Sequence, residues 1–257
     1  MIREITSTTN PTIKNLRSLI TSKKARQESG QFIVEGWRGI KTLLDHESPL
    51  YQLEQLVISK DWKNGALPDS IDTIAVPSHV FEKISDVRNA QGILGVVSKK
   101  KDAPEFPTIG KFLLLDNLRD PGNLGTLIRS AIGSGFDGIL LYGDCVEPEN
   151  PKVIRSTMGT FAFSNIWNIS KEALFQWLEK GFELCVTTGL GGENLYEAEF
   201  SDKTILVIGS EAHGVSDELF KRAAKKITIP LQPECESLNA AIAGSICMFQ
   251  ITNKARA

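Results

Sequence analysis

The strongest constraint on the fold is a series of short, nearly all-apolar runs in the second half of the chain. They read KFLLLDNL (111–118), DGILLYG (137–143), FELCVTTG (182–189), KTILVIGS (203–210) and KKITIPL (225–231), with helical patterns between them. Strands that are apolar on both faces and alternate with helices indicate a parallel sheet covered on both sides. Ligands of such sheets bind beyond the carboxyl ends of the strands, so the segments at those ends are the candidate site.

A boundary is expected at SKKKDAPEFPTIGK (98–111), where lysines, two prolines and a glycine interrupt the apolar pattern. Before it, NPTIKNLRSLI predicts a helix capped by Asn10, and SHVFEKIS predicts a helix capped by Ser78. Strand-like runs lie between these helices. We therefore expect a small α/β domain over residues 1–98, a linker over 99–110 and the parallel-sheet domain over 111–257.

Composition narrows the class of protein. The 257 residues are 41% hydrophobic, which suits a globular chain, and no run approaches the roughly 20 apolar residues of a membrane helix. The start of the chain has no hydrophobic secretory core, so we expect a cytoplasmic protein. The four cysteines form no CxxC pair and have no nearby histidine. We therefore expect free thiols, no disulfide framework and no metal site.

The net charge of −2 hides an excess of basic residues in the first 30 positions. Such a segment suits an RNA phosphate backbone, and a solvated helix face explains so few charges equally well. The candidate RNA contacts are Lys14, Arg17, Lys23, Lys24 and Arg26.

Three unusual stretches fall near strand ends: DNLRDPGNLGTLIRSA (116–131), GSEAHGVSDEL (209–219) and PECESLNAAIAGS (233–245). None matches the glycine fingerprint of a dinucleotide site or of a P-loop. Three of the polar residues in them have a structural alternative. Arg129 suits a surface ion pair, Glu211 suits the cap of the next helix, and Ser237 suits the cap of the last helix, whose run of small residues predicts a buried helix. Capping does not explain Asn239, which is expected to lie past that cap.

Taken in order, the motifs DPGNLGTLIRSA, VIGSEAHGVSDEL and ITIPLQPECESLNAAIAGS resemble those of the SpoU (TrmH-like) RNA 2′-O-ribose methyltransferases, within the SPOUT superfamily. The resemblance spans roughly residues 111–252. It implies a C-terminal segment threaded into a trefoil knot, S-adenosylmethionine as methyl donor and a homodimer with active sites at the subunit interface. It also implies that residues 1–98 form an RNA-binding domain of the ribosomal L30e type.

The resemblance further implies roles for single residues. Arg129 would activate the ribose hydroxyl, and the other polar site positions would be Asn123, Glu211, Ser237 and Asn239. Main-chain atoms around Thr187, Gly189, Gly209, Ile229, Leu231 and Leu238 would hold the donor. Ribosomal RNA is the favoured substrate. Transfer RNA remains an alternative substrate, and a catalytically silent RNA-binding protein remains an alternative function.

Overall fold

The structure is a computed structural model, and we describe residues 2–100 and 107–253. These residues form two compact units. Unit 1 contains residues 2–100 together with 148–163, and unit 2 contains 107–147 together with 164–253. Residues 148–163 thus belong to unit 1 although they lie within the range expected for the second domain. Half of the linker expected over residues 99–110, namely residues 101–106, lies outside the described residues.

Unit 1 has a mixed sheet between helices. The strand order is β1-β4-β3-β5-β2, in which β1, β4 and β3 run parallel while β5 is antiparallel to both of its neighbours. The elements are β1 (Ile2–Glu4), α1 (Pro11–Thr21), α2 (Lys23–Ser29), β2 (Gln31–Glu35), α3 (Trp37–Asp45), β3 (Tyr51–Ser59), β4 (Asp72–Val76), α4 (Ser78–Phe81), η1 (Glu82–Ile84), β5 (Ile93–Lys99), α6 (Pro151–Ser156) and η2 (Thr160–Phe163).

Alternation along β2 divides the core of unit 1 between the two faces of its sheet. Ile33 faces one side and joins the core that contains Leu16 and Leu19 of α1. Phe32 lies on the other side, where its ring meets the rings of Tyr51 at 5.1 Å and Phe161 at 6.4 Å between centroids. Phe161 belongs to η2, so the segment 148–163 completes one side of this core.

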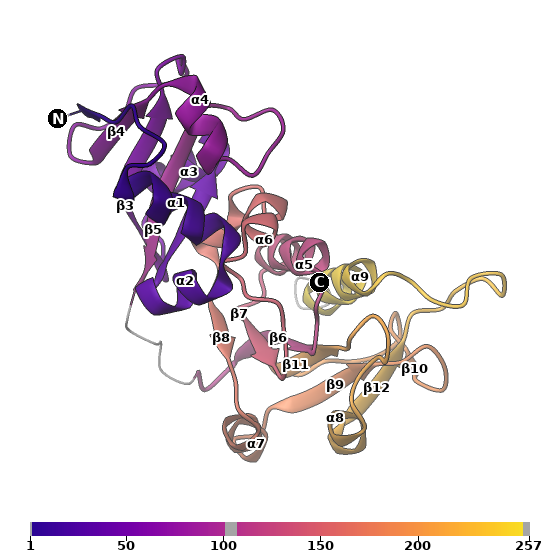
Figure 1. Ribbon diagram of the computed structural model, residues 1–257. Coiled ribbons are helices and arrows are strands. Elements are labelled where there is room, and N and C mark those ends of the chain that lie inside the picture. Colours follow the sequence, from indigo (N-terminus) through magenta and orange to yellow (C-terminus); the bar gives the residue numbers. More distant parts are fainter. Residues whose placement is uncertain (1, 101–106, 254–257) are drawn as a thin grey trace. The chain divides into compact units, whose positions relative to one another are not determined.

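Unit 2 has the parallel sheet that the apolar runs predict, and that prediction is confirmed. Its strand order is β10-β12-β9-β11-β6-β7-β8, with every pair parallel (Figure 1). The elements are β6 (Gly110–Asp116), α5 (Pro121–Ser134), β7 (Gly138–Tyr142), β8 (Ile166–Asn168), α7 (Lys171–Glu179), β9 (Glu183–Thr187), β10 (Glu193–Asn194), β11 (Lys203–Ile208), α8 (Asp217–Arg222), β12 (Lys225–Thr228) and α9 (Ala240–Asn253).

Helices cover both faces of this sheet. On one face, Phe112 of β6 packs edge-on against Trp177 of α7 with a centroid distance of 4.7 Å. On the other face, α9 packs on α5 and β11. A Cβ at Gly244 of α9 would lie 2.6 Å from the Leu127 side chain of α5, so any larger residue there would require Leu127 to shift.

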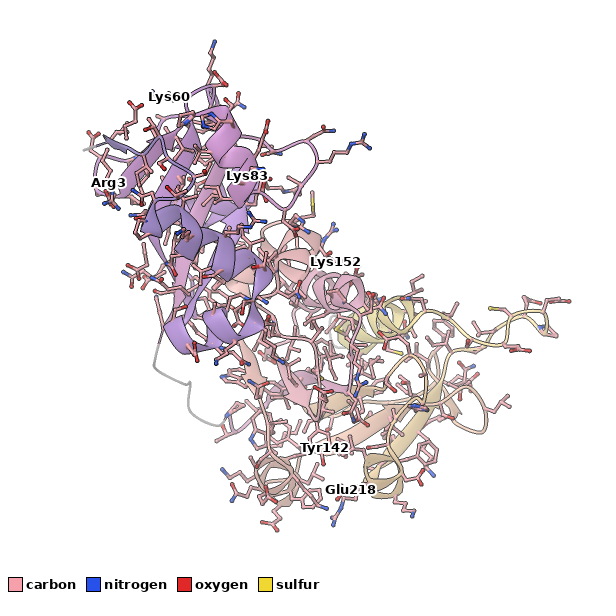
Figure 2. The ribbon with its side chains drawn as sticks, in the orientation of Figure 1. Arg3, Lys60, Lys83, Tyr142, Lys152 and Glu218 are labelled. Carbon is pink, nitrogen blue, oxygen red and sulfur yellow. The ribbon has the colours of Figure 1, made fainter. Side chains whose placement is uncertain are left out.

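One polar cluster ties the α7 side of unit 2 together. The Tyr142 hydroxyl donates to Glu218 at 3.4 Å, and both residues are labelled in Figure 2. Glu218 also pairs with Lys171. Burial, followed by the charge of Glu218, raises the pKa of Tyr142 above its ordinary value. The phenol therefore stays a hydrogen-bond donor at neutral pH.

Local capping follows the sequence in one place and departs from it in another. The Asn10 side chain accepts from the Thr12 main-chain N–H at 2.9 Å, so the predicted cap of α1 is confirmed. The predicted Ser78 cap is wrong, because α4 already includes Ser78 and Pro77 occupies the cap position without a side-chain bond. The Ser78 hydroxyl instead donates to Asp61.

All four cysteines are free thiols, as expected from their spacing. Burial raises the pKa of Cys185 and of Cys247 to about 12, so neither is a reactive thiolate at neutral pH. No helix among residues 2–100 and 107–253 combines the length and apolar character that crossing a membrane demands.

Candidate active site

The first two sequence motifs meet because the strands that precede them are neighbours. β6 and β11 pair in parallel, with Leu115 opposite Ile208, so the segments after both strands emerge at the same edge of the sheet. The chain continues from β6 toward β7 and β8 on one side, whereas β9 and β12 lie beyond β11 on the other (Figure 1). This reversal of strand order is the position where ligands of open α/β sheets bind.

A chain of hydrogen bonds joins all three motifs at this edge. The Asn239 amide nitrogen donates to the Asn123 side-chain oxygen at 3.0 Å, and the Asn123 amide nitrogen donates to Glu211 at 2.8 Å. Asn123 is in the first turn of α5, Glu211 follows β11 and Asn239 precedes α9. Residues that are 88 and 116 positions apart in the sequence thus form one polar site.

The direction of this chain is fixed at its α9 end. The Asn239 side-chain oxygen accepts from the main-chain N–H groups of Ala241 at 2.9 Å and Ile242 at 3.2 Å. Its amide nitrogen must therefore point to Asn123, and each following amide is oriented in turn. The chain ends on the Glu211 carboxylate, whose other oxygen can accept a hydrogen bond from a ligand hydroxyl.

These contacts correct the prediction for the cap of α9. The expectation that Ser237 caps this helix and that Asn239 lies past the cap is wrong, because α9 begins at Ala240 and Asn239 itself makes the capping bonds. The two polar atoms of the Asn239 amide therefore make different contacts, since the oxygen caps α9 and the nitrogen bonds Asn123. The prediction that the helix is buried also needs correction, because Ile242 and Phe249 are each 51% exposed.

The Glu211 loop is held by a glycine contact. A Cβ at Gly209 would lie 2.0 Å from the carbonyl carbon of Gly214 and 2.1 Å from the Val215 nitrogen, so backbone crosses directly over Gly209. Ser210 and Gly214 close the loop with paired main-chain bonds of 3.0 and 2.9 Å. The backbone crossing and the paired bonds together hold the turn that carries Glu211.

Substitution of Gly209 is therefore expected to destabilise the protein. Gly209→Ala should lower the free energy of unfolding by about 3 kcal/mol or more, because both groups that the new methyl would meet are backbone. Urea unfolding measures this. Gly189→Ala is the matched control, since a Cβ there meets no heavy atom within 4 Å. Equal stability of the two variants would contradict the role given to the Gly209 crossing.

A buried carboxylate that sequence analysis missed joins the first two motifs from beneath. Asp116, at the end of β6, is 1% exposed and accepts from the Ser216 main-chain N–H at 2.7 Å and from the Asn117 amide at 2.7 Å. The sequence did contain a signal for this residue, because Asp116 directly follows an all-apolar run. An acid at such a position is buried, and a buried charge is costly unless it has hydrogen-bond partners. Asp116 thus positions the loop that carries Glu211.

The residues expected to hold a methyl donor lie at one side of this polar chain. Thr187, Gly209 and Ile229 sit at the carboxyl ends of the adjacent strands β9, β11 and β12. The main-chain groups of Leu231 and Leu238 make no hydrogen bond within the described part of the chain. These two leucines therefore offer apolar side chains next to free main-chain donors and acceptors, and there is open space at Gly189. Such a combination fits an adenine and its ribose.

Two expected site residues are not joined to the chain of hydrogen bonds. Arg129 and Ser237 are exposed, and their side chains make no hydrogen bond or ion pair with any residue among 2–100 and 107–253. Six helical residues separate Arg129 from Asn123, which corresponds to about 600° of rotation, so the two occupy different faces of α5. Arg129 is thus free to meet a partner outside this chain's own network.

One predicted RNA contact is buried. Arg26 is 6% exposed, and its guanidinium donates to the carbonyls of Leu19 at 2.7 Å and Ile20 at 3.0 Å, which closes the end of α1. The role expected for it is therefore corrected to a structural one. Lys14, Arg17, Lys23 and Lys24 are exposed, and Lys24 pairs with Glu28 at 3.7 Å.

Comparison with known proteins agrees with this geometry. Residues 110–249 match the SpoU rRNA Methylase family, and residues 10–95 match the MRM3-like substrate binding domain. A Synechocystis protein described as an uncharacterized tRNA/rRNA methyltransferase is 32% identical over 97% of this chain and 93% of its own length. The Bacillus subtilis 23S rRNA (guanosine(2553)-2′-O)-methyltransferase RlmP is 27% identical over 97% of this chain and 99% of its own.

Solved structures give the same result. The AdoMet-bound rRNA methyltransferase from Sinorhizobium meliloti has a TM-score of 0.86 at 28% identity and covers 98% of each chain. The resemblance inferred from three short motifs is confirmed by a match over more than half of the sequence. This chain belongs to the SpoU rRNA methylase family.

Proposed function

We propose that this protein transfers a methyl group from S-adenosylmethionine to a ribose 2′-hydroxyl in ribosomal RNA. The observation that carries the proposal is the Asn239–Asn123–Glu211 chain of hydrogen bonds at the strand-order reversal. The named activities of the relatives support ribosomal RNA as the substrate. The AdoMet in the Sinorhizobium structure supports the donor.

The residues of the chain supply orientation and charge. Bound beside Leu231 and Leu238, S-adenosylmethionine would provide an electrophilic methyl group. Glu211 would accept a hydrogen bond from the ribose and hold it in line, because its second oxygen is free of the Asn123 bond. The Arg129 guanidinium would lower the cost of removing the 2′-hydroxyl proton, and its planar fork would also bind the adjacent phosphate.

In a dimer, Arg129 of one copy could reach the active site of the other copy. α9 is apolar on its outward face, where Ile242 and Phe249 are exposed one above the other. Neighbouring α5 carries Arg129, and the two helices are linked by a 2.6 Å bond between Ser130 and Ser245. We infer a homodimer through α9 in which Arg129 of each copy serves the partner's site.

Charges placed on the outward face of α9 should separate the copies. The double variant Ile242→Glu, Phe249→Glu is expected to sediment as a monomer and to lose methyl transfer, because two carboxylates would be buried without partners. Leu190→Glu is the control for association, since Leu190 is an exposed apolar residue of unit 2 outside α9. A double variant that remains a dimer would place the interface elsewhere.

Residues 1–98 are proposed to select the RNA through the exposed cations of α1 and α2. The affinity of the wild type should fall as salt rises, and the triple variant Lys14→Gln, Arg17→Gln, Lys23→Gln should reduce that log–log slope by about 0.7–0.9 per lost phosphate contact. Lys60→Gln, whose lysine pairs with Glu4, serves as a control. An unchanged slope in the triple variant would remove this surface from RNA binding.

Further features of the family belong to the same proposal. The chain returns from β12, near one edge of the sheet, to pack α9 on α5 and β11 at its centre, which supports the trefoil knot. The mixed sheet between helices in unit 1 supports the L30e-like assignment. A cytoplasmic location is proposed on the ground of the ribosomal RNA substrate.

Transfer of a tritiated methyl group tests the function directly. The protein, S-adenosylmethionine and unmethylated ribosomal RNA should yield labelled RNA whose modified linkage resists alkali, because methylation removes the 2′-hydroxyl nucleophile. Transfer RNA should remain unlabelled. Labelling of transfer RNA alone would replace the substrate, and RNA binding without any transfer would favour a silent RNA-binding protein.

A further inference from the structure

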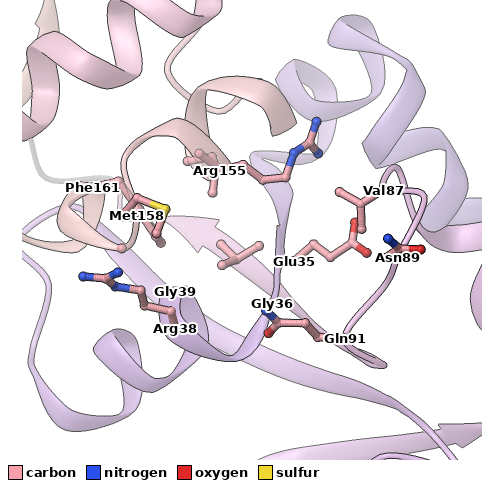
Figure 3. A pocket seen from close by; sticks show the side chains of 13 residues that line it. Glu35, Gly36, Arg38, Gly39, Val87, Asn89, Gln91, Arg155, Met158 and Phe161 are labelled. Atoms are coloured by element: carbon pink, nitrogen blue, oxygen red, sulfur yellow. The ribbon is translucent and has the colours of Figure 1, made fainter.

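Unit 1 contains a hollow that the active site does not use. Its volume is about 320 Å³, near the lower end of the roughly 300–1,000 Å³ found for small-ligand pockets (Figure 3). Val34, Ile154 and Phe161 form an apolar floor, and each is at most 3% exposed. The hollow is therefore built into the packed core of unit 1.

Its walls come from two distant parts of the sequence. One wall belongs to the range that matches a substrate-binding domain, and the other belongs to residues 148–163, within the range that matches the methylase family. Two glycines let these walls pack closely. A Cβ at Gly39 would lie 2.8 Å from Val34, and one at Gly159 would lie 2.8 Å from Thr42.

The loop over residues 85–92 is held firmly at the rim of the hollow. The Glu35 carboxylate accepts from the Ser85 hydroxyl and from the Asp86 main-chain N–H, so both of its oxygens are used. At the other end of the loop, the Gln91 side-chain oxygen accepts from the Trp37 main-chain N–H at 2.9 Å. The Gln91 amide nitrogen is consequently oriented away from that bond and makes none within the described part of the chain.

Uncommitted polar groups surround the apolar floor. Asn89 is exposed and its amide makes no hydrogen bond among the described residues, like the Gln91 nitrogen. Arg38 is also exposed, and its guanidinium has no partner in the same residues. Arg155 instead pairs with Asp86 at 2.9 Å. Figure 3 shows Arg38 and Met158 at one end of the hollow and Glu35 and Asn89 at the other.

Met158 is held in an unusual conformation at this rim. Its φ is 54°, in the left-handed region that few non-glycine residues adopt, and its apolar side chain is 44% exposed. Such strain costs of order 1–3 kcal/mol and is found at ligand sites. Here it leaves an apolar side chain exposed beside the hollow.

We propose that this hollow binds one unstacked nucleotide of the RNA substrate. The base would lie on the apolar floor and against Met158, the Asn89 and Gln91 amides would bond its edge, and Arg38 would bind its phosphate. RNA proteins recognise unpaired bases by this combination of apolar contact and amide hydrogen bonds. The inference rests on the proposed function, and it assigns to unit 1 a base-reading subsite separate from the surface cations of α1 and α2.

Three substitutions in the full-length protein test this subsite without disturbing its frame. Gln91→Glu keeps the acceptor for Trp37 but removes the amide donor. Met158→Gly removes the side chain and relieves the positive φ, and Arg38→Gln removes the free charge. Each variant should bind unmethylated ribosomal RNA about tenfold more weakly, as expected for the loss of one good base or phosphate contact. Affinity for S-adenosylmethionine should not change.

Two control variants and a crosslinking experiment show whether RNA occupies the hollow. Gln52→Glu and Arg3→Gln make the same chemical changes at exposed positions of unit 1 outside the hollow, and they should leave RNA affinity unchanged. Ribosomal RNA containing 4-thiouridine should crosslink to the peptides that carry Met158 or Gln91. Wild-type affinity and methyl transfer in all three variants would overturn the subsite and leave the proposed function intact. A wild type that transfers no methyl group to RNA would overturn both.

Discussion

Replacing Arg129 by alanine is expected to lower the rate of methyl transfer by about 10²–10⁴-fold, the usual contribution of a positioned proton-transfer group. Affinity for S-adenosylmethionine should stay the same, because Arg129 lies on α5, whereas the residues proposed to bind the donor lie at the ends of β9, β11 and β12. Stability should also be unchanged, since the side chain is exposed and makes no hydrogen bond or ion pair with the described residues.

The measurement is kcat under saturating RNA and donor, with calorimetry for donor binding. Arg129→Lys is the informative companion variant, because a lysine keeps the charge but cannot bind a hydroxyl and a phosphate through one planar group. It should recover only part of the lost rate. An Arg129→Ala protein that turns over at nearly the wild-type rate would remove the residue from the mechanism.

The second large loss of activity is expected from substitution of Asn239, because its side-chain oxygen and nitrogen make different hydrogen bonds. Asn239→Ala should lose the cap of α9, at a cost of about 0.5–2 kcal/mol, and lose activity as well. Asn239→Asp separates the two roles. Its carboxylate still accepts from Ala241 and Ile242 at the positive end of a helix, yet it has no proton to donate to Asn123.

We therefore expect Asn239→Asp to unfold at the wild-type urea concentration but to lose roughly 100-fold or more in kcat/KM, because the ribose would lose its alignment. Asn10→Asp is the matched control, since Asn10 caps α1 through the same kind of bond and has no site role. It should retain both stability and activity. Full activity in Asn239→Asp would reduce this residue to a helix cap.

The parts of the fold that follow from local patterns were predictable from the sequence. The apolar runs gave the parallel sheet of unit 2, and Asn10 with Pro11 gave the start of α1. The motif residues Asn123, Glu211 and Asn239 do meet, because the strands before the first two are neighbours. Periodicity and short motifs carry this information since each depends on residues close in sequence.

The errors arose where long-range packing decides the outcome. Arg26 has the charge of an RNA contact, but the end of α1 needs donors for its free carbonyls and takes the guanidinium. Residues 148–163 join unit 1 because Phe161 packs with Phe32 and Tyr51, rings that are more than 100 positions away. No local pattern indicates either contact.

The shared role of Asn239 illustrates the same limit at the level of one side chain. The sequence predicts that Ser237 caps the last helix, and it assigns no local role to Asn239. Only the folded chain shows the second bond of 3.0 Å to Asn123, whose own amide bonds Glu211. The amide nitrogen for which we propose a site role is therefore an atom that a capping rule leaves unassigned.

The most direct test of the central claim is a map of 2′-O-methyl groups in ribosomal RNA from cells with and without this protein. We predict that one position loses its methyl group when the protein is absent and regains it when the wild type is restored, but not when Arg129→Ala is supplied. Identical ribosomal RNA maps from the two cells would contradict the assignment of this protein as a ribosomal RNA 2′-O-methyltransferase.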